Sequence, residues 1–439
     1  MKFARSLWQL WRHEYFRRLL WIRIVIQSSD GVLQVALAAY VLFSPERQPD
    51  AVSIAIVLAI TLLPFSILGP FAAVLIDRVS RRQVLVVVNL TRALVTMGLA
   101  AVIVTGLNTV GAQVLIYGGL LLAMSLNRFL LAALSASLPH TIDASEYMIA
   151  NSVVPTVGPA GLLIGVAIAT PLRLILGHVM PDHRANAILF VIAAAGFLLS
   201  AGMALWIPRR QLGPDVIGTT KSREVVTGLL EAVAHLRSRR PAGLGLLTIA
   251  AHRLIYGIVT VSMILVFRNY FHTPDQLDAA IADLGVLVVI TGAGFVFASV
   301  LTPPLSARLG VRRTMIICLL ASAVFQLVPG AIYAQVPLMI AAFLLGLAAQ
   351  GIKICVDTLV QAYVSDDFKG RVFVLYDMIF NVALVVAAII AAIILPLNGK
   401  SVLILVLMAI CYLLIGLWFA LASRGVSMNE GTQSLQAVS

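Results

Sequence analysis

Long apolar runs dominate this sequence and restrict what the chain can fold into. Twelve runs reach about 20 residues or more, the length at which an α-helix crosses a bilayer, and short polar turns separate them. The 439 residues are 61% hydrophobic and 11% charged, whereas a soluble domain carries about 25% charged residues. The runs lack the period-two alternation of barrel strands. The sequence therefore predicts an all-α polytopic membrane protein.

We expect twelve transmembrane helices, in two bundles of six. The expected spans are 19–43, 51–76, 83–106, 112–137, 148–171, 185–207, 243–268, 284–304, 314–333, 336–363, 372–396 and 401–423. The corresponding domains are an amphipathic N-terminal segment 1–18, a first bundle 19–207, a linker 208–242, a second bundle 243–424 and a tail 425–439.

The distribution of basic residues predicts the orientation. With the N-terminus inside, the inner segments hold 22 Lys and Arg residues, Arg92 among them. The outer segments hold 5, which are Arg47, Arg173, Arg184, Arg268 and Lys400. Basic residues accumulate on the cytoplasmic side of membrane proteins, so we expect both termini in the cytoplasm of a multi-pass inner-membrane protein. The +12 net charge is then a topology signal, and no nucleic-acid partner is expected.

The linker contains a second membrane-associated element. In SREVVTGLLEAVAHLRSR, residues 222–239, the apolar side chains recur at helical spacing, with Ser222 as a candidate N-cap. We expect an amphipathic helix on the inner membrane surface that ties the two bundles together.

The two halves also repeat a basic turn after their second span. AVLIDRVSRR (73–82) and PPLSARLGVRR (303–313) align so that Arg82 lies over Arg312. Repeated bundles of this kind are typical of transporters that rock around a central site.

The first turn resembles the signature of the major facilitator superfamily, which reads roughly G-x-x-x-D-R-x-G-R-R. The matching positions are Asp77, Arg78, Arg81 and Arg82. The chain departs from it at both glycines, where it has Ala73 and Ser80, and the second copy has Gly310 but replaces the acid with Ala307. The resemblance covers most of the chain and implies two six-helix bundles around a central cavity and secondary active transport.

Within that superfamily the chain is similar to the drug-efflux branch of macrolide-efflux and Tap-like pumps. LVQAYVSDDFKGRVFVLYDMI (359–379) resembles the branch's entry to helix eleven, and VGPAGLLIG (157–165) partly matches the antiporter motif. The antiporter-motif positions are Gly158, Pro159 and Gly161. This resemblance implies export and does not identify the substrate.

Charged side chains inside spans are the candidate functional residues, because a charge in hydrocarbon needs a partner or a role. Span one carries Arg23, Gln27, Asp30 and Gln34 at spacings of four, three and four, on one helical stripe. Asp30 is the leading proton-coupling candidate. Span four carries Asn127 and Arg128, and an arginine here resembles the superfamily's helix-four motif. Because helices one and four both line the cavity in that fold, the resemblance implies that Arg128 is the partner of Asp30 or contacts an anionic group of the substrate. The alternative is a permanent Arg–Asp pair that only holds helices together.

The second bundle carries a comparable set. His252, Arg253 and Tyr256 lie in span seven, and Gln350, Lys353, Asp357 and Gln361 share one face of span ten. His252 and Asp357 are further proton-coupling candidates; the alternatives are a structural histidine and a self-neutralising Lys353–Asp357 pair.

The charges inside the spans predict the class of substrate. Arg23, Arg128, Arg253 and Lys353 oppose Asp30 and Asp357, a balance of +2, which hints at an anionic or zwitterionic amphiphile. In the major facilitator fold that the chain resembles, the turn after helix two packs against the inner end of helix eleven. The resemblance therefore implies a cytoplasmic latch, in which Asp77 lies near the start of helix eleven and Arg78 or Arg81 bridges to Asp377.

Three functions compete at this point. The first is a proton-coupled exporter of an amphipathic molecule, and the second is a lysophospholipid flippase or uptake carrier of the same fold. A membrane-bound enzyme is the distant third, since HExxH, P-loop and GxSxG motifs are absent from the sequence. We expect no metal and no cofactor, and a monomer in the lipid bilayer.

Overall fold

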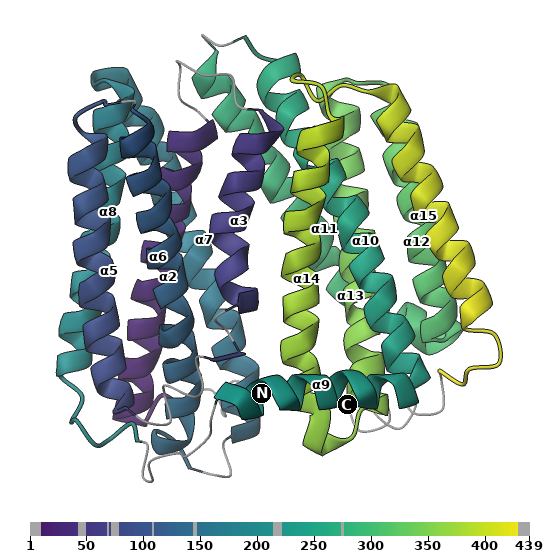
Figure 1. The fold of residues 1–439 in the computed structure, drawn as a ribbon, viewed down its shortest axis with the longest axis horizontal. Coiled ribbons are helices and arrows are strands. Elements are labelled where there is room, and N and C mark those ends of the chain that lie inside the picture. The colour runs from purple at the N-terminus through teal and green to yellow at the C-terminus, as the bar shows by residue number, and fades with distance from the viewer. Residues whose placement is uncertain are drawn as a thin grey trace. The chain divides into compact units, whose positions relative to one another are not determined.

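The computed structural model describes residues 10–42, 50–67, 70–71, 79–107, 109–143, 147–213, 222–273 and 276–428. Within them, all regular elements are helices (Figure 1). Eleven are long and apolar enough to cross a membrane, and the shorter apolar helix α3 (Ala51–Ile67) occupies part of the remaining predicted span. The predicted all-α membrane fold is therefore confirmed.

The chain divides into two compact units. The first comprises Met1–Ser44 and Ile67–Val225, and the second comprises Pro45–Ser66 and Val226–Ser439. Helix α3 thus packs with the second unit, where the Ser66 hydroxyl donates to the Met378 carbonyl at 3.3 Å. The sequence places this segment in the first bundle, and the division into six and six stays a prediction.

Five long helices lie in the part of the first unit that the structure describes. They are α2 (Glu14–Leu42), α5 (Arg81–Ile103), α6 (Val110–Ser137), α7 (Tyr147–Val179) and α8 (Asp182–Leu205), with the 3₁₀ turn η1 (Leu138–His140) after α6. Most of their ends lie within about five residues of the predicted spans; α7 continues eight residues beyond the predicted end at 171.

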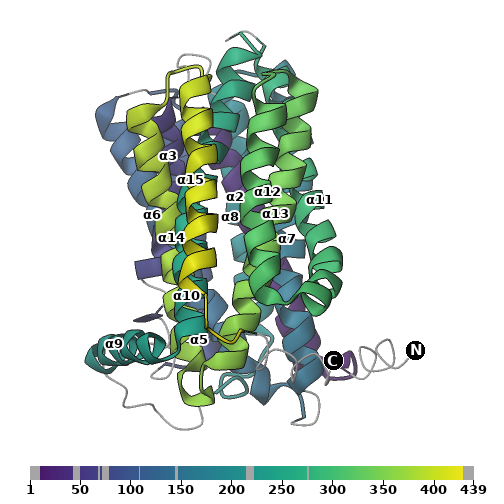
Figure 2. The same cartoon turned by 90° about the vertical axis from the view of Figure 1, so that its right-hand side faces the viewer.

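The second unit contains α3 and the remaining helices. They are α9 (Ser222–Ser238), α10 (Arg240–Leu265), the π-helical segment η3 (Val266–Tyr270), α11 (Leu277–Leu309), α12 (Val311–Gly330), α13 (Gln335–Tyr363), α14 (Asp366–Ile394) and α15 (Val402–Ala422). Helix α12 packs against both α13 and α15 (Figure 2).

The two units repeat one packing pattern. In the first, α2 packs on α7 and α8, while α5 packs on α6 and α8. In the second, α10 packs on α14 and α15, while α12 packs on α13 and α15. The transmembrane helices can be numbered in order within each half of the sequence, with α3 as the second helix of the first half. In both halves the first helix then packs on the fifth and sixth, and the third helix packs on the fourth and sixth. The internal repeat seen in the basic turns therefore extends to the packing of the helices.

The repeated basic turn has the same structural role in both units. Arg82 Nη2 donates to the Leu205 carbonyl at 3.2 Å, at the end of α8. Its aligned counterpart Arg312 donates from Nη2 to the Ala420 carbonyl at 2.7 Å, near the end of α15. A cation is favourable at a helix C-terminus, so each arginine caps the last helix of its own unit.

The backbone explains why the two turns differ at the glycine position. Gly310 has φ +83°, which a residue with a Cβ adopts only with strain. Ser80 has φ −53°, which suits any residue. The first turn therefore departs from the glycine of the signature because its backbone does not require one.

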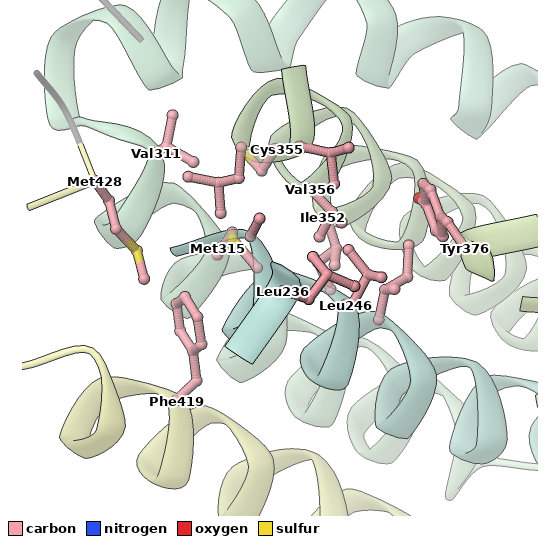
Figure 3. Packing of buried hydrophobic residues seen from close by; sticks show 14 of the residues in the cluster. Leu236, Leu246, Val311, Met315, Ile352, Cys355, Val356, Tyr376, Phe419 and Met428 are labelled. Carbon is pink, nitrogen blue, oxygen red and sulfur yellow. The ribbon is translucent and has the colours of Figure 1, made fainter. Parts of the chain in front are cut away.

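Helix α9 is the amphipathic helix expected in the linker, although Ser222 is its first helical residue and not the N-cap. It runs across the ends of α10 and α14 (Figures 1 and 2). Its Leu236 lies in the core of the second unit beside Leu246 and Ile352 (Figure 3). Arg371 of α14 donates to Glu231 at 2.7 Å, so α9 is fixed to the second unit by packing and by charge.

Candidate functional site

Asp30 of α2 lies at the centre of a buried polar cluster in the first unit. Its side chain is 1% exposed and forms a salt bridge with Arg92 of α5, which is 0% exposed. Gln27, one turn earlier on the same stripe, donates from Nε2 to Asp30 Oδ2 at 3.2 Å. The stripe predicted from the sequence therefore faces the interior of its own unit at Gln27 and Asp30, and Gln34 is half-buried.

Arg92 is the functional candidate that the sequence analysis missed. It was counted among the inner-loop charges, but it lies in the middle of α5 with its guanidinium 3.9 Å from the Phe197 ring centroid. The prediction that Arg128 is the ion-pair partner of Asp30 is wrong in that the direct salt bridge is with Arg92. The signal was available, because position 92 falls inside the predicted span 83–106.

Asn127 and Arg128 of α6 complete this cluster. Both are buried, and both interact electrostatically with Asp30. Asp30 is thus held between two cations on different helices. One carboxylate between two buried guanidinium groups leaves the cluster with a net positive charge.

Helix α7 packs closely against α2 through the residues of the antiporter-like motif. A Cβ at Gly158 would lie 3.3 Å from Arg23 Nη2, and one at Gly161 would lie 2.9 Å from Gln27 Cβ. The Ser28 hydroxyl donates to the Gly161 carbonyl at 2.9 Å. Pro159 is exposed. The motif glycines therefore set how closely α7 approaches the polar stripe of α2.

The same contact predicts a large effect of adding one methyl group. Gly165→Ala should destabilise the protein by about 1–3 kcal/mol, the usual cost of overpacking, because the new Cβ would collide with the Ser28 carbonyl. Gly118→Ala on α6 is the control, since its Cβ meets nothing within 4 Å and alanine favours helix. Thermal unfolding should separate the two variants; equal melting temperatures would contradict the close contact.

A pocket of about 260 Å³ of empty volume adjoins the first cluster. Arg23 is its only charged lining residue, and the other walls are Phe16, Leu19, Leu20, Leu134 and Leu138. Among the described residues, Arg23 Nε and Nη1 have no hydrogen-bond partner. A cation at the wall of an apolar pocket suits a molecule with an anionic group and an apolar body.

Arg253 of α10 is the corresponding buried cation of the second unit. It is 6% exposed, and its guanidinium lies 3.7 Å from the Phe380 ring centroid and 5.3 Å from that of Tyr256. No salt bridge or hydrogen bond of its side chain occurs among the described residues. Aromatic faces attract the cation but do not neutralise it, so Arg253 keeps a full charge available for an anion.

Lys353 and Asp357 form the expected pair on α13. Lys353 Nζ donates to Asp357 Oδ2 at 2.7 Å, and both side chains are about one-third exposed. Lys353 also lies 5.6 Å from the ring centroid of Tyr376 on α14. Gln350 is half-buried and Gln361 is exposed on the same helix. Whether this pair opens during transport stays a prediction.

His252 is 1% exposed and is surrounded by aromatic rings. Its ring lies 5.4 Å from that of Tyr412 and 5.9 Å from that of Tyr256. Neither ring nitrogen has a hydrogen-bond partner among the described residues. This packing fits the structural alternative at least as well as proton coupling.

The gate residues lie partly outside the described residues. Asp77 and Arg78 belong to the undescribed part of the chain, so the latch toward Asp377 stays a prediction. Arg81 donates to the carbonyls of Ala136 and Leu212 at 2.9 and 3.1 Å, which fastens the end of α6 to the segment after α8. Asp377 is exposed on α14.

Two further charges differ from their expected positions. Arg173 was expected in an outer loop, but it lies in α7, where it is 2% exposed and pairs with Asp182; its Nε donates to Asn186 Oδ1 at 2.6 Å. Arg268 was also assigned to the outer side and is 1% exposed in η3. Arg173 lies in a helix that extends beyond its predicted end, whereas Arg268 is the last residue of its predicted span.

Comparisons with known proteins agree with this geometry. The sequence family described as Major Facilitator Superfamily matches residues 246–437. Two proteins described as uncharacterized MFS-type transporters, from Mycobacterium bovis and Mycobacterium tuberculosis, are each 33% identical over 394 residues, covering 88% of this chain and 86% of theirs.

Solved structures show the same fold at low sequence identity. The nucleoside transporter NupG superposes with a TM-score of 0.65 at 14% identity and covers 93% of this chain and 98% of its own. The peptide transporter POT superposes with a TM-score of 0.67 at 13% identity, covering 94% of both chains. At this identity the likeness concerns the fold alone.

Proposed function

The chain belongs to the major facilitator superfamily, and on that premise we propose that it is a proton-coupled exporter of an anionic or zwitterionic amphiphile. It is a membrane transporter of that fold, and its family implies transport and not enzymatic catalysis. Export, proton coupling and the class of substrate are the proposed parts. Alternating access between two orientations is the proposed mechanism.

The net positive charge of the candidate residues inside the helices is the main support for the proposed class of substrate. The balance from the sequence alone is +2, with four cations against two carboxylates. Among the candidate residues Arg92 adds a fifth cation, which makes five against two, or +3. Of these cations Arg92, Arg128 and Arg253 are buried, whereas Arg23 is half-buried and Lys353 is about one-third exposed. Buried charges of one sign are costly unless a partner neutralises them, and an anionic substrate would supply that partner.

The pocket at Arg23 supports an amphipathic substrate. Its walls are apolar apart from that guanidinium. Arg253 offers the same combination in the second unit, where Phe380 and Tyr256 surround the cation. We propose that the substrate is drug-like or lipid-like and that Arg23 and Arg253 are the cations that attract its anionic group.

Asp30 is the proposed proton-coupling residue. A carboxylate that binds a proton would lose its salt bridge with Arg92, and this change in charge would couple proton binding to the conformation of the unit. Asp357 is the second candidate, because its partner Lys353 is also a cation that protonation would release.

A lipid or lysophospholipid flippase of the same fold is the second candidate function. The apolar pocket beside Arg23 favours it, because a lysophospholipid joins one acyl chain to a charged headgroup. We place the protein in the inner membrane as a monomer with both termini cytoplasmic.

Transport into sealed proteoliposomes tests the proposal. The purified protein is reconstituted, and uptake of an anionic lysophospholipid, an anionic drug-like amphiphile and a cationic amphiphile is measured with and without an imposed pH gradient. We expect gradient-driven uptake of an anionic compound only. Preference for the cationic compound would contradict the substrate class, and lysophospholipid movement without a gradient would favour the flippase.

A further inference from the structure

A second pocket lies inside the second unit, apart from the charged residues discussed above. It has about 450 Å³ of empty volume, part of it open to the outside, and lies among α10, η3, α12, α13 and α15. Ile258, Val259, Met263 and Leu338 form much of its wall, and no charged residue lines it. An uncharged, mostly apolar lining favours an uncharged occupant.

One buried polar atom in this pocket has no partner. Gln326 lines the pocket and is 1% exposed. Its Nε2 donates to the Leu405 carbonyl at 3.0 Å, and because a carbonyl can only accept, this contact fixes which end of the amide is the oxygen. That oxygen accepts no hydrogen bond from the described residues. A buried acceptor left unpaired costs about 1–3 kcal/mol.

The backbone around the pocket departs from regular helix at two places. Val266–Tyr270 form a π-helical segment at the end of α10, a form that is frequent at functional sites. Tyr333 has φ +46°, the only positive φ of a non-glycine residue in the described part of the chain. Such a conformation persists where its surroundings require it.

Hydrogen bonds hold Tyr333 in that conformation at the rim. Its hydroxyl accepts from the Ser401 backbone N–H at 3.1 Å, and Lys400 lies 5.2 Å from its ring centroid. Lys400 Nζ also donates to the Tyr270 hydroxyl at 2.6 Å. Burial raises the pKa of the Tyr333 hydroxyl above its ordinary value, so the rim offers the pocket a neutral phenol.

Helix α15, which forms one wall of the pocket, carries exposed apolar side chains. Ile404, Leu405 and Met408 line the pocket and are only half-buried. Their neighbours Leu403 and Leu407 are 69% and 45% exposed, as expected of side chains that face acyl chains. An occupant can therefore enter from the bilayer, which favours an aliphatic molecule over a water-soluble one.

We propose that this pocket binds an uncharged aliphatic alcohol from the bilayer, with its hydroxyl donating to Gln326 Oε1 and its chain among the apolar walls. This is a site separate from the buried cations, and it does not depend on the proposed transport of an anion. Occupancy would fill space between α10, α12 and α15, the helices that pack together in this unit.

Photolabelling of the full-length protein in detergent tests the site. The probes are 1-octanol and octane, each carrying a diazirine at the same carbon, and the adducts are mapped by peptide mass spectrometry. We expect the octanol probe to label peptides containing Met263 or Met408 about fivefold more than the octane probe, the factor of a single hydrogen bond. This comparison uses the unmodified protein, so it does not depend on a variant that folds.

Two variants test the assigned atoms. Gln326→Leu removes the acceptor and keeps the volume, and it should reduce the preference for octanol to about one. Ile404→Trp should fill the pocket and reduce labelling by both probes. Equal labelling by the two probes, a preference that persists in Gln326→Leu, or no labelling above background, as for a pocket holding only water, would overturn the proposal.

Discussion

Asp30→Asn is expected to abolish transport driven by a pH gradient and to lower the free energy of unfolding by about 3–5 kcal/mol. The change leaves the buried guanidinium of Arg92 opposite a neutral amide, while Arg128 adds to the positive field at the same point. Breaking a buried ion pair from one side is costly because the remaining charge has no counter-ion. The measurements are chemical or thermal unfolding and gradient-driven uptake in proteoliposomes.

A double variant separates coupling from a purely structural role. Asp30→Asn combined with Arg92→Gln removes both charges and should recover most of the lost stability. If Asp30 carries the proton, transport stays independent of the gradient in this stable double variant. Recovery of gradient-driven transport would show instead that the pair only holds α2 against α5.

Glu231→Gln is the matched control for Asp30→Asn. It breaks the Arg371–Glu231 salt bridge, whose partners are 49% and 52% exposed. An exposed pair contributes about 0–1 kcal/mol, so stability and transport should change little. A loss as large as that of Asp30→Asn would show that the effect does not come from burial.

The fold class could be predicted from the sequence because few backbone structures are stable in the hydrocarbon core of a membrane. Every apolar run of the required length has to satisfy its backbone internally, and a helix does so within a single segment. The repeat was also readable, since the alignment of Arg82 with Arg312 predicts two arginines that cap equivalent helices. Helix ends were less predictable: α7 and α11 extend well beyond the predicted apolar runs.

The partners of the buried charges could not be read from the sequence. Spacing places Gln27 and Asp30 on one face of α2, but it does not say which helix that face meets. The choice of Arg92 over Arg128 depends on how α5, α6 and α8 pack, including the stacking of Arg92 on Phe197. The pocket at Gln326 could not be predicted from the sequence either, because side chains from several helices that are distant in the sequence line it.

Arg253→Gln is expected to weaken binding of an anionic substrate by about 2 kcal/mol or more, about 30-fold. Arg253 is buried and meets aromatic rings but no carboxylate among the described residues. Arg253→Lys should recover only part of the affinity, because lysine keeps the charge but loses the planar stacking on Phe380. Binding is measured by calorimetry or thermal shift with an anionic amphiphile and its uncharged analogue.

Two controls test whether the effect depends on the charge of the ligand and on the position of the arginine. They are the uncharged analogue and a variant of a surface arginine. If Arg253 binds the anionic group, Arg253→Gln should change affinity for the uncharged analogue little. Arg308→Gln removes an exposed arginine from the end of α11 and should leave both affinities unchanged. Equal losses for the two ligands would assign Arg253 to the packing of α10 against α14, and the excess of buried positive charge would then need another explanation than an anionic substrate.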